Sequence, residues 1–196
     1  MEGVDDWDKL PLFCVVATPR RSTSSLEDTM RLRNFSVLFA VAALSCAVRD
    51  THQLNLKRPS FDAVTMQRYG CYGPCPVYTV EISYNGKVAF KGERFVALAG
   101  EQLGSTPPAD LARLDQAIVD IGFFSLREQY QSGEDGCTTW ATDNATVSIL
   151  VSTASRQHRV TYYYGCEIGI GLSIARLSQT IDEVAHARRW VGHGAL

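Results

Sequence analysis

Two stretches of the chain alternate apolar and polar residues, which is the pattern of β-strands with one buried face. In residues 77–90 the alternating run VYTVEIS is followed by Asn85-Gly86 and then by a second run, KVAF. This arrangement predicts a β-hairpin with a type I′ turn. Residues 146–152 and 158–165 alternate in the same way around a polar turn and predict a second hairpin, and residues 61–69 are expected to add a strand before the first one.

Two further stretches repeat apolar residues at helical spacing. The first begins at Thr106-Pro107, which we expect to supply an N-cap and the first helical residue, and ends at Gly122. The second is expected to run from about residue 170 to Trp190, with Arg188 and Arg189 at the negative end of its dipole. The order β-β-β-α-β-β-α is dominated by hairpins and predicts an α+β fold, a mainly antiparallel sheet with two amphipathic helices packed on one face.

The N-terminal part has the layout of an export signal. The run MRLRNFSVLFAVAALSCA at residues 30–47 has a basic start, a central apolar stretch and small residues at its end. The apolar stretch is too short to span a bilayer, which favours a secretory signal peptide. Because signal peptides normally begin at the initiator methionine, we expect Met30 to be the true start and residues 1–29 to be an over-extended, disordered N-terminus.

Two processing routes fit the end of this signal. The residues ALSC resemble a lipobox and make Cys46 a candidate lipidation site, whereas cleavage after Ala47 fits the small-residue rule about as well. Residues 48–60 are polar and predict a linker, and residues 61–193 are expected to form a single globular domain. The predicted location is therefore outside the cytoplasm, either periplasmic or as a membrane-anchored lipoprotein, with membrane contact only through an N-terminal lipid anchor.

Composition and charge narrow the class of partner. The chain has 196 residues, of which 45% are hydrophobic, and its formal net charge is -2 without a basic block. This distribution gives no indication of nucleic-acid binding. The predicted partner is instead an envelope protein or a cell-wall component.

The expected domain contains four cysteines: Cys71, Cys75, Cys137 and Cys166. In an oxidising compartment they are expected to form disulfides, and four cysteines allow three pairings. We favour Cys71 with Cys75 and Cys137 with Cys166. The alternative is a redox pair of Cys71 and Cys75, but redox pairs usually have C-x-x-C spacing at a helix N-terminus, and here a strand follows.

Aromatic side chains gather on or near the loops that these disulfides would hold. Tyrosine and tryptophan suit surfaces that are both apolar and wet. The candidate interaction surface consists of Tyr69, Tyr72, Trp140, Asp143 and Tyr163.

The residue patterns do not predict catalysis. The segment GLSIA at 171–175 has the outline of a nucleophile elbow around Ser173, but that motif requires a strand-turn-helix in a parallel sheet. The histidines lack the paired spacing of zinc ligands, and the acidic residues near Gly136 match no calcium loop. We therefore nominate no catalytic residue, no metal site and no cofactor, and we favour a protein that is not an enzyme.

Several motifs together resemble a known family. CYGPCPVYTVEISYNGKVAFKGERFV, FFSL, Thr142-Asp143, TYYYGC and IDEVA with RRWVG resemble, in this order, the bacterial domain-of-unknown-function family 6438. The resemblance covers about residues 61–193 and implies an exported or lipoprotein envelope domain without an assigned activity. It therefore transfers no catalytic residues. The segment EIGIGLS after Cys166 departs from the proline-containing approach to the last helix that the family implies.

Two functions are consistent with these features. The first is a non-catalytic binding or interaction module of the bacterial envelope, stabilised by disulfides. The alternative is a periplasmic thiol-disulfide redox protein that uses Cys71 and Cys75.

Overall fold

The computed structural model describes residues 58–192. The strands in chain order are β1 (Ala63–Arg68), β2 (Val77–Ser83), β3 (Lys87–Arg94), β4 (Gly100–Ser105), β5 (Gln129–Tyr130), β6 (Thr139–Trp140), β7 (Thr146–Ser152), β8 (Gln157–Tyr163) and β9 (Cys166–Glu167). The α-helices are α2 (Pro108–Asp120), α3 (Gly171–Val184) and α4 (Arg188–Val191), and two short 3₁₀ helices, Phe123–Ser125 and Gly133–Asp135, lie between α2 and β6. The predicted signal at 30–47, with Cys46, lies outside the described residues.

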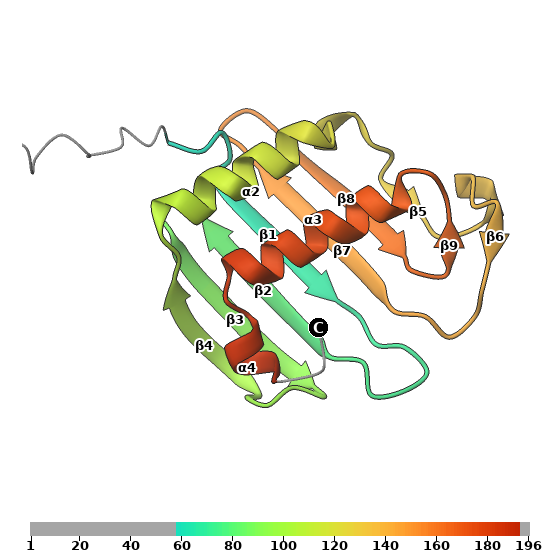
Figure 1. Ribbon diagram of the computed structural model, residues 1–196, viewed down its shortest axis with the longest axis horizontal. Helices are drawn as coiled ribbons and strands as arrows, with labels where there is room; N and C mark the ends of the chain where they lie inside the picture. Colours follow the sequence, from blue (N-terminus) through green and yellow to red (C-terminus); the bar gives the residue numbers. More distant parts are fainter. Residues whose placement is uncertain (1–57, 193–196) are drawn as a thin grey trace, which may run out of the picture. The chain divides into compact units, whose positions relative to one another are not determined.

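Seven of these strands form one sheet in the order β4-β3-β2-β1-β7-β8-β5. Every neighbouring pair is antiparallel except β5 with β8. The two predicted hairpins are present as β2–β3 and β7–β8, and β1 lies between them in the middle of the sheet (Figure 1). Strands β6 and β9 form a separate two-stranded sheet.

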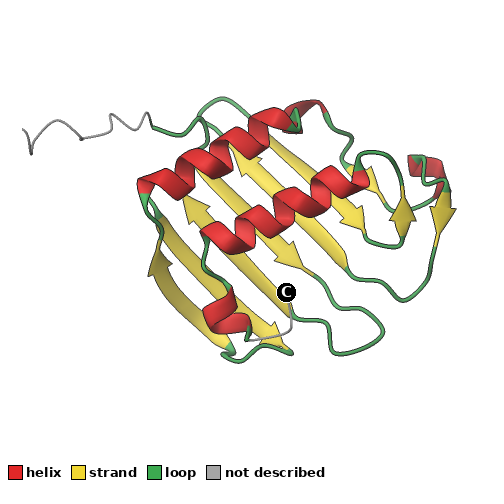
Figure 2. Cartoon of the chain, in the orientation of Figure 1, coloured by secondary structure: helices red, strands yellow, loops and turns green. Residues whose placement is uncertain are grey.

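Helices α2 and α3 cross the same face of the large sheet (Figure 2). The strand residues that point to this face and the apolar stripes of the two helices form one core. Its helical members include Leu111, Leu114 and Ile118 on α2 and Ile174, Leu177 and Ile181 on α3. The predicted α+β class, with a mainly antiparallel sheet and both helices on one face, is therefore confirmed.

The last helix is interrupted, so the prediction of a continuous helix to Trp190 was wrong. His186 has a left-handed backbone, with φ of 52°. The N–H groups of His186 and Ala187 donate to the carbonyls of Glu183 and Asp182. This is the hydrogen-bond pattern of a Schellman motif, which closes a helix end.

The interruption redirects the chain onto the sheet. The Trp190 ring of α4 stacks on Phe90 of β3, with ring centroids 5.0 Å apart. Arg188 and Arg189 therefore belong to this separate short helix and do not stand at the end of α3.

Two predicted details of the first half also differ from the structure. The β2–β3 turn is not type I′, because Asn85 does not have a positive φ and Gly86 does (83°). The Gly86 N–H donates to the Ser83 carbonyl, which gives a type I turn followed by a left-handed glycine. Helix α2 begins one residue later than expected, at Pro108, because Pro107 precedes a proline and is extended, with ψ of 157°, so it is the N-cap. The Thr106 hydroxyl caps nothing.

Strand β4 was not predicted. Its sequence GEQLGS lacks an apolar alternation, and its one large apolar residue, Leu103, is 84% exposed. Pairing with β3 along its whole length makes it a strand. Gly104 fits this position because a larger residue would meet Arg189 and Trp190 of α4.

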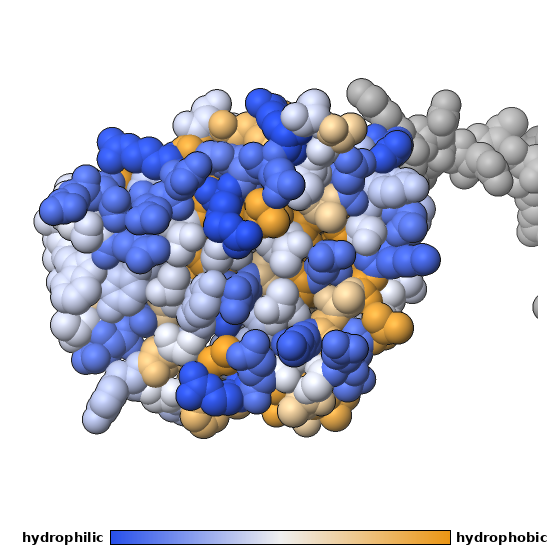
Figure 3. All heavy atoms as spheres, turned by 180° about the vertical axis from the view of Figure 1, so that it is seen from behind, coloured by the Kyte–Doolittle hydropathy of each residue, from blue (hydrophilic) through white to orange (hydrophobic). Residues whose placement is uncertain are grey.

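The sheet face opposite the helices is open and mainly polar. Figure 3 shows it from this side, with hydrophilic residues over most of the surface and apolar residues in small separate spots. Within residues 58–192, no helix has the length and apolarity needed to cross a membrane.

Candidate functional site

A buried ion pair joins the sheet to α3. Arg68 ends β1 and has the same strand parity as the buried Val64 and Met66, so its side chain points toward the helices. Its Nε and Nη2 atoms both donate to Asp182 Oδ2 of α3, at 3.0 and 2.6 Å. Only 18% of the Arg68 side chain and 4% of the Asp182 side chain are exposed. The pair is thereby largely removed from water.

Tyr78 supplies the third hydrogen bond to the carboxylate. It is the cross-strand partner of Arg68 on β2, and its hydroxyl donates to Asp182 Oδ1 at 2.6 Å. In all three contacts an Asp182 oxygen is the acceptor, which is the pattern of an ionised carboxylate.

Burial is the largest single influence on each pKa in this group, but neighbouring charges decide the direction for Arg68. It raises the pKa of the Asp182 carboxyl, and the charge of Arg68 and the hydrogen bond from Tyr78 oppose that rise. Burial also raises the pKa of the Tyr78 hydroxyl, and the negative charge of Asp182 raises it further. For Arg68, burial acts downward, but the charge of Asp182 together with the neighbouring tyrosines outweighs it and raises the pKa. Arg68 and Tyr78 therefore keep their protons at neutral pH.

Ser178 and Tyr164 bind the end of the guanidinium. Arg68 Nη1 donates to the Tyr164 hydroxyl at 3.0 Å, and Nη2 donates to Ser178 Oγ at 3.3 Å. The Ser178 hydroxyl itself donates to the Ala175 carbonyl at 2.7 Å, so Tyr164 is the donor in the 2.8 Å contact between the two hydroxyls. These contacts occupy four of the five N–H groups of an arginine. Among the described residues, the second N–H of Nη1 has no partner.

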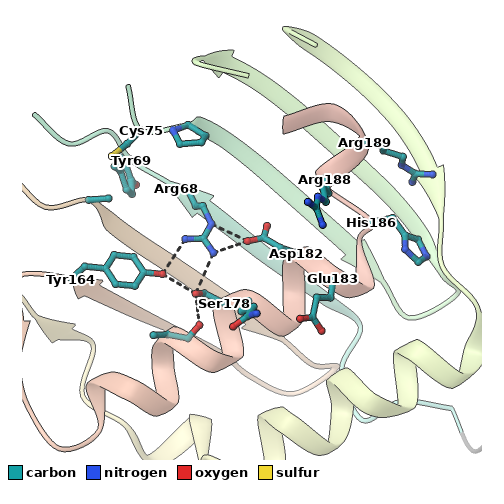
Figure 4. Close-up of a pocket in the computed structure, with 14 residues that line it drawn as sticks. Arg68, Tyr69, Cys75, Tyr164, Ser178, Asp182, Glu183, His186, Arg188 and Arg189 are labelled. Atoms are coloured by element: carbon teal, nitrogen blue, oxygen red, sulfur yellow. Dashed lines mark hydrogen bonds and ion pairs between the residues drawn. The ribbon is translucent and has the colours of Figure 1, made fainter. Parts of the chain in front are cut away.

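A cavity of about 1140 Å³ opens over this network. Its walls come from the end of β1 and the cysteine loop, from α3, and from the turn into α4. Figure 4 shows Arg68 between Tyr69 and Cys75 on one side and Asp182 and Arg188 on the other. The lining presents more apolar than polar surface. The volume is slightly above the range of about 300 to 1,000 Å³ that is usual for ligand sites.

The charges that line the cavity do not cancel. Asp182 is compensated by Arg68, and Glu183 is bonded at 2.7 Å to Arg113, which lies outside the lining. Arg189 lies over the Trp190 ring, 4.0 Å from its centroid. Arg188 makes no ion pair within residues 58–192, so this wall carries an uncompensated positive charge.

The predicted cysteine loop forms one wall of the cavity. Its two ends are held by Arg68 and Tyr78, which pair across β1 and β2 and both bond Asp182. The Cys71–Cys75 disulfide closes the loop, and Cys75 lines the cavity. The structure also joins Cys137 to Cys166, so both bridges follow the pairing favoured from the sequence.

The predicted interaction residues lie at one end of the sheet. The Tyr69 N–H donates to the carbonyl of Thr146 on β7, and Thr146 pairs with Tyr163 of β8. The Trp140 ring packs against Tyr163, with centroids 5.6 Å apart, and the Tyr72 N–H donates to the Asp143 carbonyl at 3.3 Å. The structure thus gathers the five residues into neighbouring contacts. Of the five, Tyr69 lines the cavity and the others do not.

The network beneath the cavity was not predicted from the sequence. Arg68, Ser178 and Asp182 were not among the candidate site residues. A signal was present, because Arg68 falls on the buried parity of its strand and the other two fall on the buried face of the last helix. Charged residues are almost never fully buried unless they are paired.

Ser178 and Asp182 are both engaged inside the network. The Ser178 proton is directed to a backbone carbonyl, and both oxygens of Asp182 are engaged, so neither group is set up as a nucleophile or a base. Within the described part of the chain, no three His, Cys, Asp or Glu side chains are grouped as metal ligands.

Comparison with known proteins places this site within a family. The family model described as a domain of unknown function, DUF6438, matches residues 62–185. The match runs from β1 through α3, so it includes Arg68, Tyr78 and Asp182 but ends before Arg188. A search of curated proteins finds no match to the chain.

Proposed function

The chain belongs to the DUF6438 family, a domain of unknown function, and we propose from its own site that it is a non-catalytic binding module of the bacterial envelope. The observation that carries the proposal is the cavity over the Arg68–Asp182 pair. A large concave site with a mostly apolar lining and a few convergent polar groups is the usual form of a ligand pocket. The signal predicted from residues 30–47 and the two disulfides support a location in an oxidising compartment.

The floor of the cavity favours recognition over chemistry. The Arg68 guanidinium is held by Asp182, Ser178 and Tyr164, which fixes its plane and leaves one N–H for a ligand. A polar group that is already ordered loses little further freedom when it binds, and such preorganisation increases affinity.

The proposal is tested with ¹⁵N-labelled protein and the low-mass fraction of an envelope extract. We expect amide shifts at residues that line the cavity. Ala175→Trp, which fills the cavity from α3, should abolish them. Leu172→Trp is the matched control, because Leu172 is on the same helix, is 71% exposed and does not line the cavity. The proposal fails if the extract causes no shifts, or if the shifts persist in Ala175→Trp.

A second candidate function is thiol-disulfide exchange at Cys71–Cys75. The observation that favours it is that Cys75 lines the cavity, where a partner could approach the bridge. Equilibration with glutathione buffers, followed by alkylation and mass spectrometry, measures the reduction potential. A value within about -270 to -120 mV supports exchange, whereas one below about -300 mV identifies a structural bridge. Cys137–Cys166, with Cys166 buried, is the internal reference.

A further inference from the structure

We propose that the cavity binds a peptide-like acid, meaning a ligand that carries amide carbonyls and one free carboxylate. This inference rests on the proposed function of the cavity and adds the chemical class of its ligand. The carboxylate is assigned to Arg188, and a carbonyl of the ligand is assigned to the unused N–H of Arg68.

The charge of the lining favours an anionic ligand. Three arginines line the cavity: Arg68, Arg188 and Arg189. Asp182 compensates Arg68, and Glu183 is paired with Arg113 outside the lining, so within residues 58–192 Arg188 and Arg189 have no carboxylate partner. Arg189 lies over the Trp190 ring and donates to the Ala185 carbonyl, whereas Arg188 makes no ion pair and no side-chain hydrogen bond within residues 58–192. Its planar fork of N–H groups matches the two oxygens of a carboxylate.

The second contact requires a neutral acceptor. In a planar guanidinium, the Nε–H and one Nη2–H point to the same side, where Asp182 lies, and the inner N–H groups point to Ser178 and Tyr164. The remaining Nη1–H therefore points to the opposite side, on which Figure 4 draws Tyr69 and Cys75. Because Asp182 already neutralises Arg68, a carbonyl oxygen suits this donor better than a second anion.

The two assigned contacts lie on different sides of the Arg68 guanidinium, so the ligand has to extend across the cavity. The lining also includes the small or apolar residues Pro76, Ala145 and Ala175. A short peptide backbone supplies a carbonyl, a chain of small side chains and a terminal carboxylate in one molecule.

The test compares acetyl-Ala-Ala-Ala with a free carboxylate and the same peptide with a C-terminal amide, titrated into ¹⁵N-labelled full-length mature protein at low salt. We expect amide shifts at the cavity and about tenfold weaker binding of the amide, the effect of losing one charge-assisted hydrogen bond. Arg188→Gln should remove the difference between acid and amide. Arg176→Gln, an exposed change on α3 outside the lining, should leave it intact.

Each other outcome overturns the inference. Equal binding of acid and amide at the cavity rejects the carboxylate and leaves the cavity as a binding site. Absence of binding by both peptides rejects the peptide-like class, and the extract experiment with Ala175→Trp then decides the proposed function separately. Shifts centred on Trp140 and Tyr163 reject the cavity as the peptide site.

Discussion

The change of Asp182 to asparagine is predicted to destabilise the protein more than any nearby surface change. Asp182→Asn keeps the shape of the side chain but leaves the Arg68 guanidinium buried without a counter-charge. Removing one partner of a buried ion pair costs about 3 to 5 kcal/mol. Because 18% of the Arg68 side chain remains exposed and the asparagine oxygen still accepts a hydrogen bond, we expect the lower end, about 3 kcal/mol.

Glu183→Gln is the matched control, one residue further along α3. Glu183 also pairs with an arginine, Arg113 at 2.7 Å, but the two side chains are 48% and 49% exposed. Exposed pairs contribute about 0 to 1 kcal/mol. The free energy of unfolding of each variant is measured by urea titration with the disulfides intact, followed by far-UV circular dichroism and by tryptophan fluorescence. With a urea dependence of about 1 to 3 kcal/mol per M, the midpoint of Asp182→Asn should fall by about 1 M or more. Equal losses in the two variants would refute the assignment of the buried pair as a structural anchor.

Three further predictions follow from the same structure. Replacing both cysteines of the Cys137–Cys166 bridge by alanine should lower the free energy of unfolding, measured in urea, by about 3.6 kcal/mol. The same change at Cys71–Cys75 should lower it by about 1.9 kcal/mol, because the bridges span sequence separations of 29 and 4. A larger loss from the shorter loop would contradict the chain-entropy argument. Burial raises the pKa of Tyr78 in the folded protein above 10.0, so above pH 10 the unfolded chain releases this proton before the folded protein does. The free energy of unfolding should therefore fall by about 1.4 kcal/mol per pH unit, and Tyr78→Phe should remove this slope. An unchanged slope in Tyr78→Phe would rule out this cause. His186→Gly should raise the Tm and stabilise by about 1 kcal/mol, because glycine adopts the left-handed φ of 52° without strain, and a lower Tm would show that the imidazole contributes more than the backbone strain costs.

The large elements of the fold follow from periodicity alone. Most positions of β2, β3, β7 and β8 alternate between apolar and polar residues, and the stripes of α2 and α3 keep helical spacing, so these strands and the two helices were predictable. Strand β4 was not, because its two glycines and exposed Leu103 give no alternation and its conformation depends on pairing with β3. The helix end at His186 was hidden for a similar reason. Histidine is not a usual residue for a left-handed C-cap, and what requires the turn is the distant stacking of Trp190 on Phe90.

The candidate site was harder to predict. It depends on polar residues that interrupt the apolar pattern, and these residues come from two segments that are far apart in the sequence. Arg68 and Asp182 are separated by 114 residues, and each alone is an ordinary polar residue at the end of an element. Their positions become informative only when both are assigned to buried faces, since each then requires the other as a partner.

The Arg68–Asp182 pair also helps to fix the ends of the cysteine loop. Arg68 and Tyr78 flank the loop and are fixed to one carboxylate, so the loop leaves and re-enters the sheet at two anchored positions. The short Cys71–Cys75 bridge then restricts the chain between those anchors and holds Cys75 in the cavity wall. In the proposed binding function, this disulfide preorganises the cavity wall, and that contribution is separate from its modest effect on the unfolded chain.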